Sequence, residues 1–154
     1  MTRLLPFLLL FATASAHAAG AYSVFATPAQ YRFVSGDIQR VCGEETLGCT
    51  DITQVALHAR CEGAGAAWMP RAAVTFAPVV HLPERAGPAA LHAIVTHELA
   101  HIHDFHAGAE SFARALVQRR FESADTCRAA MLEEEAIFSA RMAYFGKLSL
   151  ALRR

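Results

Sequence analysis

The fold is decided by residues 88–108, which read PAALHAIVTHELAHIHDFHAG. Apolar side chains recur through this stretch at helical spacing, at Leu91, Ile94, Val95, Leu99, Ile102 and Phe105. Pro88 follows Gly87 and suits a first helical turn, and Gly108 is typical of a helix end. The spacing predicts a helix over 88–108 with one apolar stripe that faces a core.

Near the centre of this helix lies the pattern H-E-x-x-H, from His97 to His101. Two imidazoles four residues apart project from one face of a helix, so both can ligate one Zn²⁺. Glu98 stands beside them, where a carboxylate can take a proton from a metal-bound water. The pattern predicts a zinc site, and the plainer alternative is a helix with two ordinary histidines.

Helical-wheel arithmetic separates the roles of these residues. At about 100° per residue, Glu98 falls about 30° from the centre of the apolar stripe, whereas His101 and His97 lie about 90° and 130° from it. Asp104 lies near the direction of His97 and is a candidate to orient a ligand imidazole, or else an ordinary exposed residue. The remaining histidines of the helix point elsewhere and are predicted to be solvated: His92, His103 and His106.

The regions around this helix indicate an α+β domain. Upstream, strand character appears over 22–26, 54–61 and 72–82, and Pro78 favours an edge position for the last of these strands. Downstream, helices are predicted over 111–120 and 126–145. A length of 154 residues suits one domain. We therefore expect a small single domain in which a short β-rich region precedes the motif helix and further helices.

With this motif on a predicted helix, residues 88–144 resemble the zincin metallopeptidases, whose active-site helix donates both histidines to a catalytic zinc. The resemblance implies a zincin-like fold and hydrolysis of peptide bonds, with Zn²⁺ as cofactor. The metzincin branch would need Gly at position 104 and His at position 107, where this chain has Asp104 and Ala107. The gluzincin branch is therefore favoured, and it takes a third ligand, a Glu, from a later helix.

Gluzincins often carry this Glu in an E-x-x-A-D or E-x-x-A-N pattern, and the chain offers E-x-x-A from Glu133 to Ala136. Ile137 stands where the Asp or Asn is usual. Small residues border Glu133 on the predicted helix, which would let two helices approach a shared metal. Glu133 is the favoured third ligand; Glu134 and Glu135 stay open, as does a solvated acidic face for all three.

The amino terminus and the charge balance bear on location and partners. Residues 1–18 are typical of a secretory signal peptide, with a cationic start, an apolar run over 4–11 and small residues at 16 and 18. That run is too short to cross a bilayer, so a mature domain over 19–154 is expected in the periplasm or outside the cell, without stable membrane insertion. Basic and acidic residues are equal at 14 each, which disfavours nucleic acid as a partner. The zincin resemblance implies a peptide or protein substrate.

Four cysteines in an exported chain predict two disulfides. The short loop from Cys42 to Cys49 is the easiest to close, which leaves Cys61 with Cys127 as the favoured second pair. A cysteine zinc site is disfavoured because no C-x-x-C pair occurs.

Two functions follow from the sequence. The first is an exported zinc metallopeptidase with Glu98 as general base and His97, His101 and Glu133 as zinc ligands. The second is a non-catalytic exported metal-binding or interaction protein on a zincin scaffold. A base beside an open three-ligand site favours the enzyme, because a closed structural site needs a fourth ligand and no base.

Overall fold

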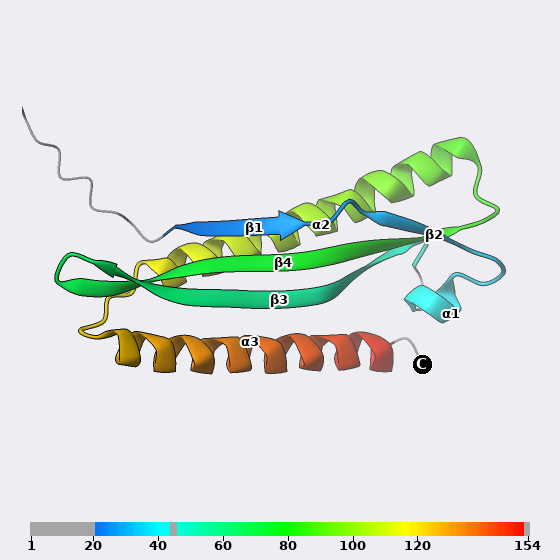
Figure 1. Cartoon of the computed structure of the whole chain (residues 1–154). Coiled ribbons are helices and arrows are strands. Elements are labelled where there is room, and N and C mark those ends of the chain that lie inside the picture. The colour runs from blue at the N-terminus through cyan, green and yellow to red at the C-terminus, as the bar shows by residue number, and fades with distance from the viewer. Residues whose placement is uncertain (1–20, 44–45, 153–154) are drawn as a thin grey trace, which may run out of the picture.

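The computed structural model describes residues 21–43 and 46–152, with side chains up to Met142. The predicted signal peptide, 1–18, lies outside the described residues. The described chain forms a small α+β domain, as predicted, in which a mixed sheet packs with helices (Figure 1). Its elements follow in the order β1 (Tyr22–Ala26), β2 (Gln30–Val34), α1 (Gln39–Cys42), β3 (Cys49–Ala64), β4 (Ala67–Pro83), α2 (Pro88–Val117) and α3 (Ala124–Leu152).

The sheet is built around β4. β3 and β4 form a long antiparallel hairpin, in which Ala64 pairs with Ala67 beside the turn. Gly65 supplies the positive φ of 65° that this turn requires. On its other side β4 pairs in parallel first with β1 and then with β2, so these two short strands lie end to end along it.

The expectation that Pro78 marks an edge strand was wrong, because β4 is the central strand. β1 pairs with β4 as far as Phe76, and β2 begins to pair at Val79, so Pro78 lies in the gap between them. The Ala72 amide donates to the Ala21 carbonyl just before β1, and the Phe76 carbonyl accepts from the Thr27 amide just after β1. Backbone groups alternate along a strand, so the nitrogen of Pro78 points to the same side, where no ladder hydrogen bond is lost.

α2 is one continuous helix, so the predicted end at Gly108 and the separate helix over 111–120 were also wrong. Glycine within a helix costs about 1 kcal/mol relative to alanine, which packing can offset. Beyond Gly108 the buried stripe continues at helical spacing through Ala109, Ala113, Leu116 and Val117. These residues pack in one core with Leu57, Ala72 and Val74 of the sheet and with Cys127 and Met131 of α3.

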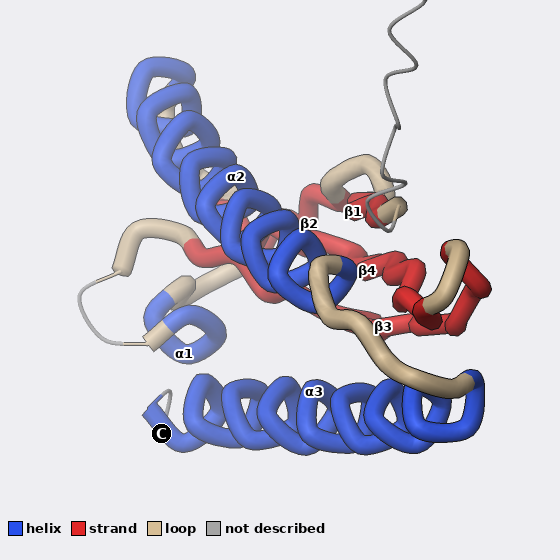
Figure 2. The backbone as a smooth tube through the Cα atoms, turned by 90° about the vertical axis from the view of Figure 1, so that its left-hand side faces the viewer, coloured by secondary structure: helices blue, strands red, loops and turns tan. Residues whose placement is uncertain are grey.

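The two long helices take different positions on the sheet. α2 crosses one face, where Phe76 packs edge-on against Phe105 and a second cluster joins Val80 and Leu82 to Ile94. In Figure 2, α2 lies over this face while α3 runs beneath β3. β4 residues with even numbers therefore face α2, and those with odd numbers face away from it.

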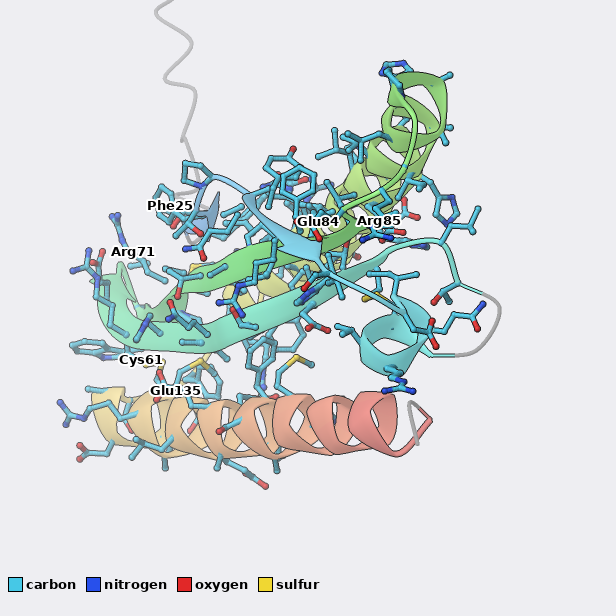
Figure 3. All side chains as sticks on the ribbon, turned by 90° about the vertical axis from the view of Figure 1, so that its right-hand side faces the viewer. Phe25, Cys61, Arg71, Glu84, Arg85 and Glu135 are labelled. Atoms are coloured by element: carbon cyan, nitrogen blue, oxygen red, sulfur yellow. A yellow bond between two sulfur atoms is a disulfide. The ribbon has the colours of Figure 1, made fainter. Side chains whose placement is uncertain are left out.

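α3 covers the outer edge of β3. The Ala59 amide donates to Glu135 Oε1 at 2.6 Å, and Cys61 is bonded to Cys127. Figure 3 shows Cys61 and Glu135 between the hairpin and the helix. The helix begins and ends outside the predicted 126–145. Both predicted disulfides are present, the second being Cys42–Cys49.

No helix in the described part of the chain is long and apolar enough to span a membrane.

Candidate metal centre

The H-E-x-x-H motif lies in the amino-terminal half of α2 (Pro88–Val117), and its three polar residues differ in burial. Glu98 is buried, with 4% of its surface exposed, whereas His97 and His101 are exposed. Glu98 therefore faces the sheet, and the histidines lie on the flank of the helix. The helix thus presents two ligand-type side chains to solvent beside one buried carboxylate.

The two imidazoles are arranged as a pair of metal ligands. Their Nε2 atoms lie 3.1 Å apart, and their rings are close to perpendicular, with an interplanar angle of 83°. Two nitrogens bound tetrahedrally to zinc at about 2.05 Å would be about 3.3 Å apart. The pair fits that requirement with little movement. The same contact is a hydrogen bond when one ring is protonated on Nε2 and the other is not.

Glu98 is held by a residue that the sequence analysis did not single out. The Thr50 hydroxyl, at the start of β3, donates to Glu98 Oε2 at 2.9 Å. The Thr50 hydroxyl oxygen also lies 3.4 Å from the backbone carbonyl oxygen of Glu98. Thr50 precedes Glu98 by 48 residues, so only the pairing of β3 with β4 and the packing of α2 bring the two together.

Gly48 allows this close approach of β3 to α2. A Cβ at this position would lie 2.5 Å from Ile94 Cγ2 and 3.1 Å from the His81 carbonyl oxygen. The same Cβ would be 3.7 Å from Glu98 Oε1. A glycine at this point thus lets the strand reach the helix beside the carboxylate.

His97 and Glu98 share one hollow of about 350 Å³. Its walls come from α2 and from the chain leading into β3: Thr46, Leu47, Gly48, Ala93, Ile94, His97 and Glu98. One histidine of the pair and the carboxylate therefore face a common space. That arrangement allows a small molecule in the hollow to contact both side chains.

The structure does not bring Glu133 to this hollow. Glu133 is exposed on α3, the helix that follows the edge of β3. Its neighbours in the triplet are engaged elsewhere, because Glu134 pairs with Arg119 Nη1 at 2.6 Å and Glu135 accepts from the Ala59 amide. Among the residues that the structure describes, no group of three or more His, Cys, Asp or Glu side chains can hold a metal.

The other polar residues of the motif helix lie apart from the pair. Asp104 was a candidate to orient a ligand imidazole, but it is exposed and its Oδ1 lies 3.9 Å from Nδ1 of His103, which is not one of the two candidate ligands. His92 and His103 are exposed, as predicted, whereas His106 is half-buried and packs edge-on against Phe76. The candidate site therefore consists of the His97–His101 pair and the neighbouring Glu98, with Thr50 and Gly48 in contact with or close to Glu98.

In comparisons with known proteins, no protein-family model, no curated protein and no solved structure matches this chain.

Proposed function

We propose that this protein is an exported zinc-dependent metallopeptidase. One observation carries the proposal: two histidine Nε2 atoms 3.1 Å apart stand beside a buried glutamate that shares a hollow with one of them. His97 and His101 hold the metal, and Glu98 is the general base. Zn²⁺ bound there supplies a Lewis acid that polarises the scissile carbonyl and makes water more acidic.

Glu98 carries the proton transfers. Its Oε2 accepts the hydrogen bond from Thr50, which fixes the carboxylate while leaving Oε1 free to take a proton from the attacking water. The same carboxyl group then gives that proton to the leaving amine, so peptide cleavage ends with Glu98 ionised again. Burial of Glu98 limits the water that competes for these steps.

The third ligand and the location of the protein are inferred from the sequence and the disulfides. Catalytic zinc usually has three protein ligands, and the resemblance to gluzincins predicts Glu133 as the third. The described geometry supports only the two histidines, so the proposal rests on them. Two disulfides are typical of an oxidising compartment and, with the predicted signal peptide, support a periplasmic or secreted protein that acts on a peptide or protein.

The second candidate function is a non-catalytic exported metal-binding protein. The exposure of both histidines favours it, because an exposed pair at i and i+4 can bind a metal shared with another molecule. The two candidates differ in what Glu98 does. In the enzyme Glu98 carries the chemistry, whereas in the binding protein it serves only the fold.

The test compares substitutions within one turn of α2. Glu98→Gln keeps the acceptor for Thr50 and should keep zinc, yet lower peptide turnover by at least about 100-fold, because an amide cannot take the proton. His97→Ala and His101→Ala should lose both zinc and activity. His103→Ala, an exposed histidine outside the pair, is the matched control and should change neither.

Zinc content is measured by titration calorimetry on the exported protein, and turnover on a mixed peptide library with and without a chelator. Zinc-loaded wild-type protein that cleaves none of the peptides would favour the binding protein. Zinc binding that survives loss of both histidines would refute the metal centre itself.

A further inference from the structure

A second polar hollow opens on the face of the sheet that points away from α2. Val80 and Leu82 pack towards Ile94 of α2. Because side chains alternate along a strand, Val79 and His81 point to the opposite face. Figure 1 views the sheet from this side, with α2 behind it. The hollow has a volume of about 480 Å³, and its polar walls come from Gln30, Arg32, Asp51, Thr53, Gln54 and His81.

A buried histidine lies in this hollow with one ring nitrogen unused. His81 is 9% exposed, and its Nε2 lies 3.0 Å from Asp51 Oδ2. In the neutral tautomer that donates from Nε2 to the carboxylate, Nδ1 carries a lone pair. Nδ1 bonds to none of the described residues, and His81 lines the hollow. In that tautomer the ring offers a hydrogen-bond acceptor to a ligand in the hollow.

Arg32 adds a cation beside this acceptor. It stands opposite His81 in the parallel pairing of β2 with β4, so the two side chains share a face about 4.8 Å apart at the backbone. Arg32 is exposed and makes no ion pair with a residue that the structure describes. Arg32 also lines the hollow, so its guanidinium is a cation that an anion in the hollow can contact.

The backbone is distorted where it lines the hollow. Gln54 has a φ of 51°, and it is the one described residue other than glycine in the left-handed region. It lies in a β-bulge between Thr53 and Ala56. Residues other than glycine seldom adopt this conformation, and β-bulges often re-aim a side chain beside an active site. Gln54 is one of the residues that line the hollow.

We infer that this hollow binds an α-hydroxycarboxylate. The carboxylate pairs with the planar guanidinium of Arg32, and the neighbouring hydroxyl donates to His81 Nδ1. A simple carboxylate would leave Nδ1 without a donor, and a neutral hydroxyamide could accept from Arg32 but would not supply the charge that strengthens the carboxylate pair. The volume admits a ligand larger than the recognised group itself. This site is independent of the proposed zinc centre, because α2 and the sheet separate the two hollows.

Three small probes that differ by one group test the inference: L-lactate, propionate, which lacks the hydroxyl, and lactamide, which lacks the charge. The exported ¹⁵N-labelled protein is titrated with each, and the amide signals of Arg32, Thr53 and Gln54 are followed. We expect saturable shifts with lactate, and a Kd at least 5-fold higher for propionate and for lactamide. Arg32→Gln should remove the preference for lactate over lactamide, while Arg120→Gln, another exposed arginine, should preserve it.

His81→Phe should remove the preference for lactate over propionate, and because Arg32 is exposed its variant tests the site even where this buried substitution fails to fold. Glu98→Gln protein should bind lactate as the wild type does, so failure of the zinc proposal and failure of this one are separate results. The inference is overturned by lactate shifts that do not saturate, by equal affinity for all three probes, or by an Arg32→Gln protein with unchanged selectivity.

Discussion

Gly48 sets how closely β3 approaches α2, and it shows how one residue supports the motif. A methyl group there would overlap Ile94 Cγ2, which lies 2.5 Å from the position of the added carbon. We expect Gly48→Ala to lower the free energy of unfolding by about 1–3 kcal/mol, as overpacking does in other cores.

Denaturant unfolding measures this change. Gly63→Ala is the control, because its Cβ would meet only the Trp68 ring at 4.0 Å, an ordinary contact. Equal stability of the Gly48 variant and the wild type would show that β3 can move away from α2 without cost.

Glu133 is the residue whose expected behaviour the structure changes. It lies on α3 along β3 and belongs to no described group that can hold a metal. We therefore expect Glu133→Ala to leave zinc affinity within about 2-fold of the wild type, whereas His97→Ala abolishes binding. Titration calorimetry with zinc measures both. A loss of zinc on Glu133→Ala alone would instead show that α3 reaches the motif when metal binds, as the gluzincin resemblance implies.

The positions of side chains around one helix, such as Glu98 and His97 on α2, could be predicted from the sequence. The helical wheel placed Glu98 nearest the apolar stripe and both histidines on its flanks. In the structure Glu98 is buried and His97 is exposed, because burial on a surface helix follows the angle from its apolar stripe. Thr50 was missed, because its contact with Glu98 depends on sheet register and helix packing across 48 residues. No local pattern encodes that contact.

At the scale of elements, α3 protects the open edge of β3. An edge strand exposes unpaired backbone groups, and natural proteins often cover such edges with a helix. Here the Ala59 amide finds its partner in Glu135 Oε1 at 2.6 Å. Glu135→Ala leaves that amide without its acceptor beneath the helix, which should cost about 1–3 kcal/mol of unfolding free energy.

Glu135→Gln retains a side-chain oxygen and should lose less stability than the alanine variant. Glu133→Ala, an exposed neighbour on the same helix, is the control and should be near neutral. Hydrogen exchange of the Ala59 amide gives a local measurement beside global unfolding. An amide that exchanges equally slowly in the wild type and in Glu135→Ala would contradict this role.

The errors at this scale share a cause. Pro78 and Gly108 are strong local signals for an edge strand and a helix end, yet neither has that effect here. Pro78 lies in the gap between β1 and β2, and the helix continues past Gly108 because buried residues continue beyond it. Tertiary structure overrode both local preferences. The gap between β1 and β2 requires no hydrogen bond from Pro78, and the packing of buried residues offsets the cost of Gly108 in the helix.

For the whole molecule, the α+β class and both disulfides followed from the sequence, because they depend on element order and on the ease of closing a loop. The position of α3 did not follow. The expected pairing of α3 with α2 assumed a shared metal, whereas α3 packs chiefly against β3. The Cys61–Cys127 bond joins the same two elements, so the disulfide and the helix packing reinforce one arrangement.

The two disulfides should therefore contribute unequally to stability. Cys61 and Cys127 are separated by 66 residues, and Cys42 and Cys49 by 7. Closing the longer loop removes more chain entropy from the unfolded state, about 4 kcal/mol against about 2 kcal/mol in the loop-entropy description. Replacing Cys61 and Cys127 together by alanine should cost the larger amount, and it also detaches α3 from the edge of β3.

Replacing Cys42 and Cys49 together is the matched comparison, and denaturant unfolding of both double variants measures the difference. The longer-loop variant should also expose the Ala59 amide to exchange, since the helix that supplies Glu135 is no longer tied down. Equal losses of stability in the two double variants would contradict the loop-length argument. Continued protection of that amide in the longer-loop variant would show that packing around Met131 holds α3 at β3 without the covalent bond.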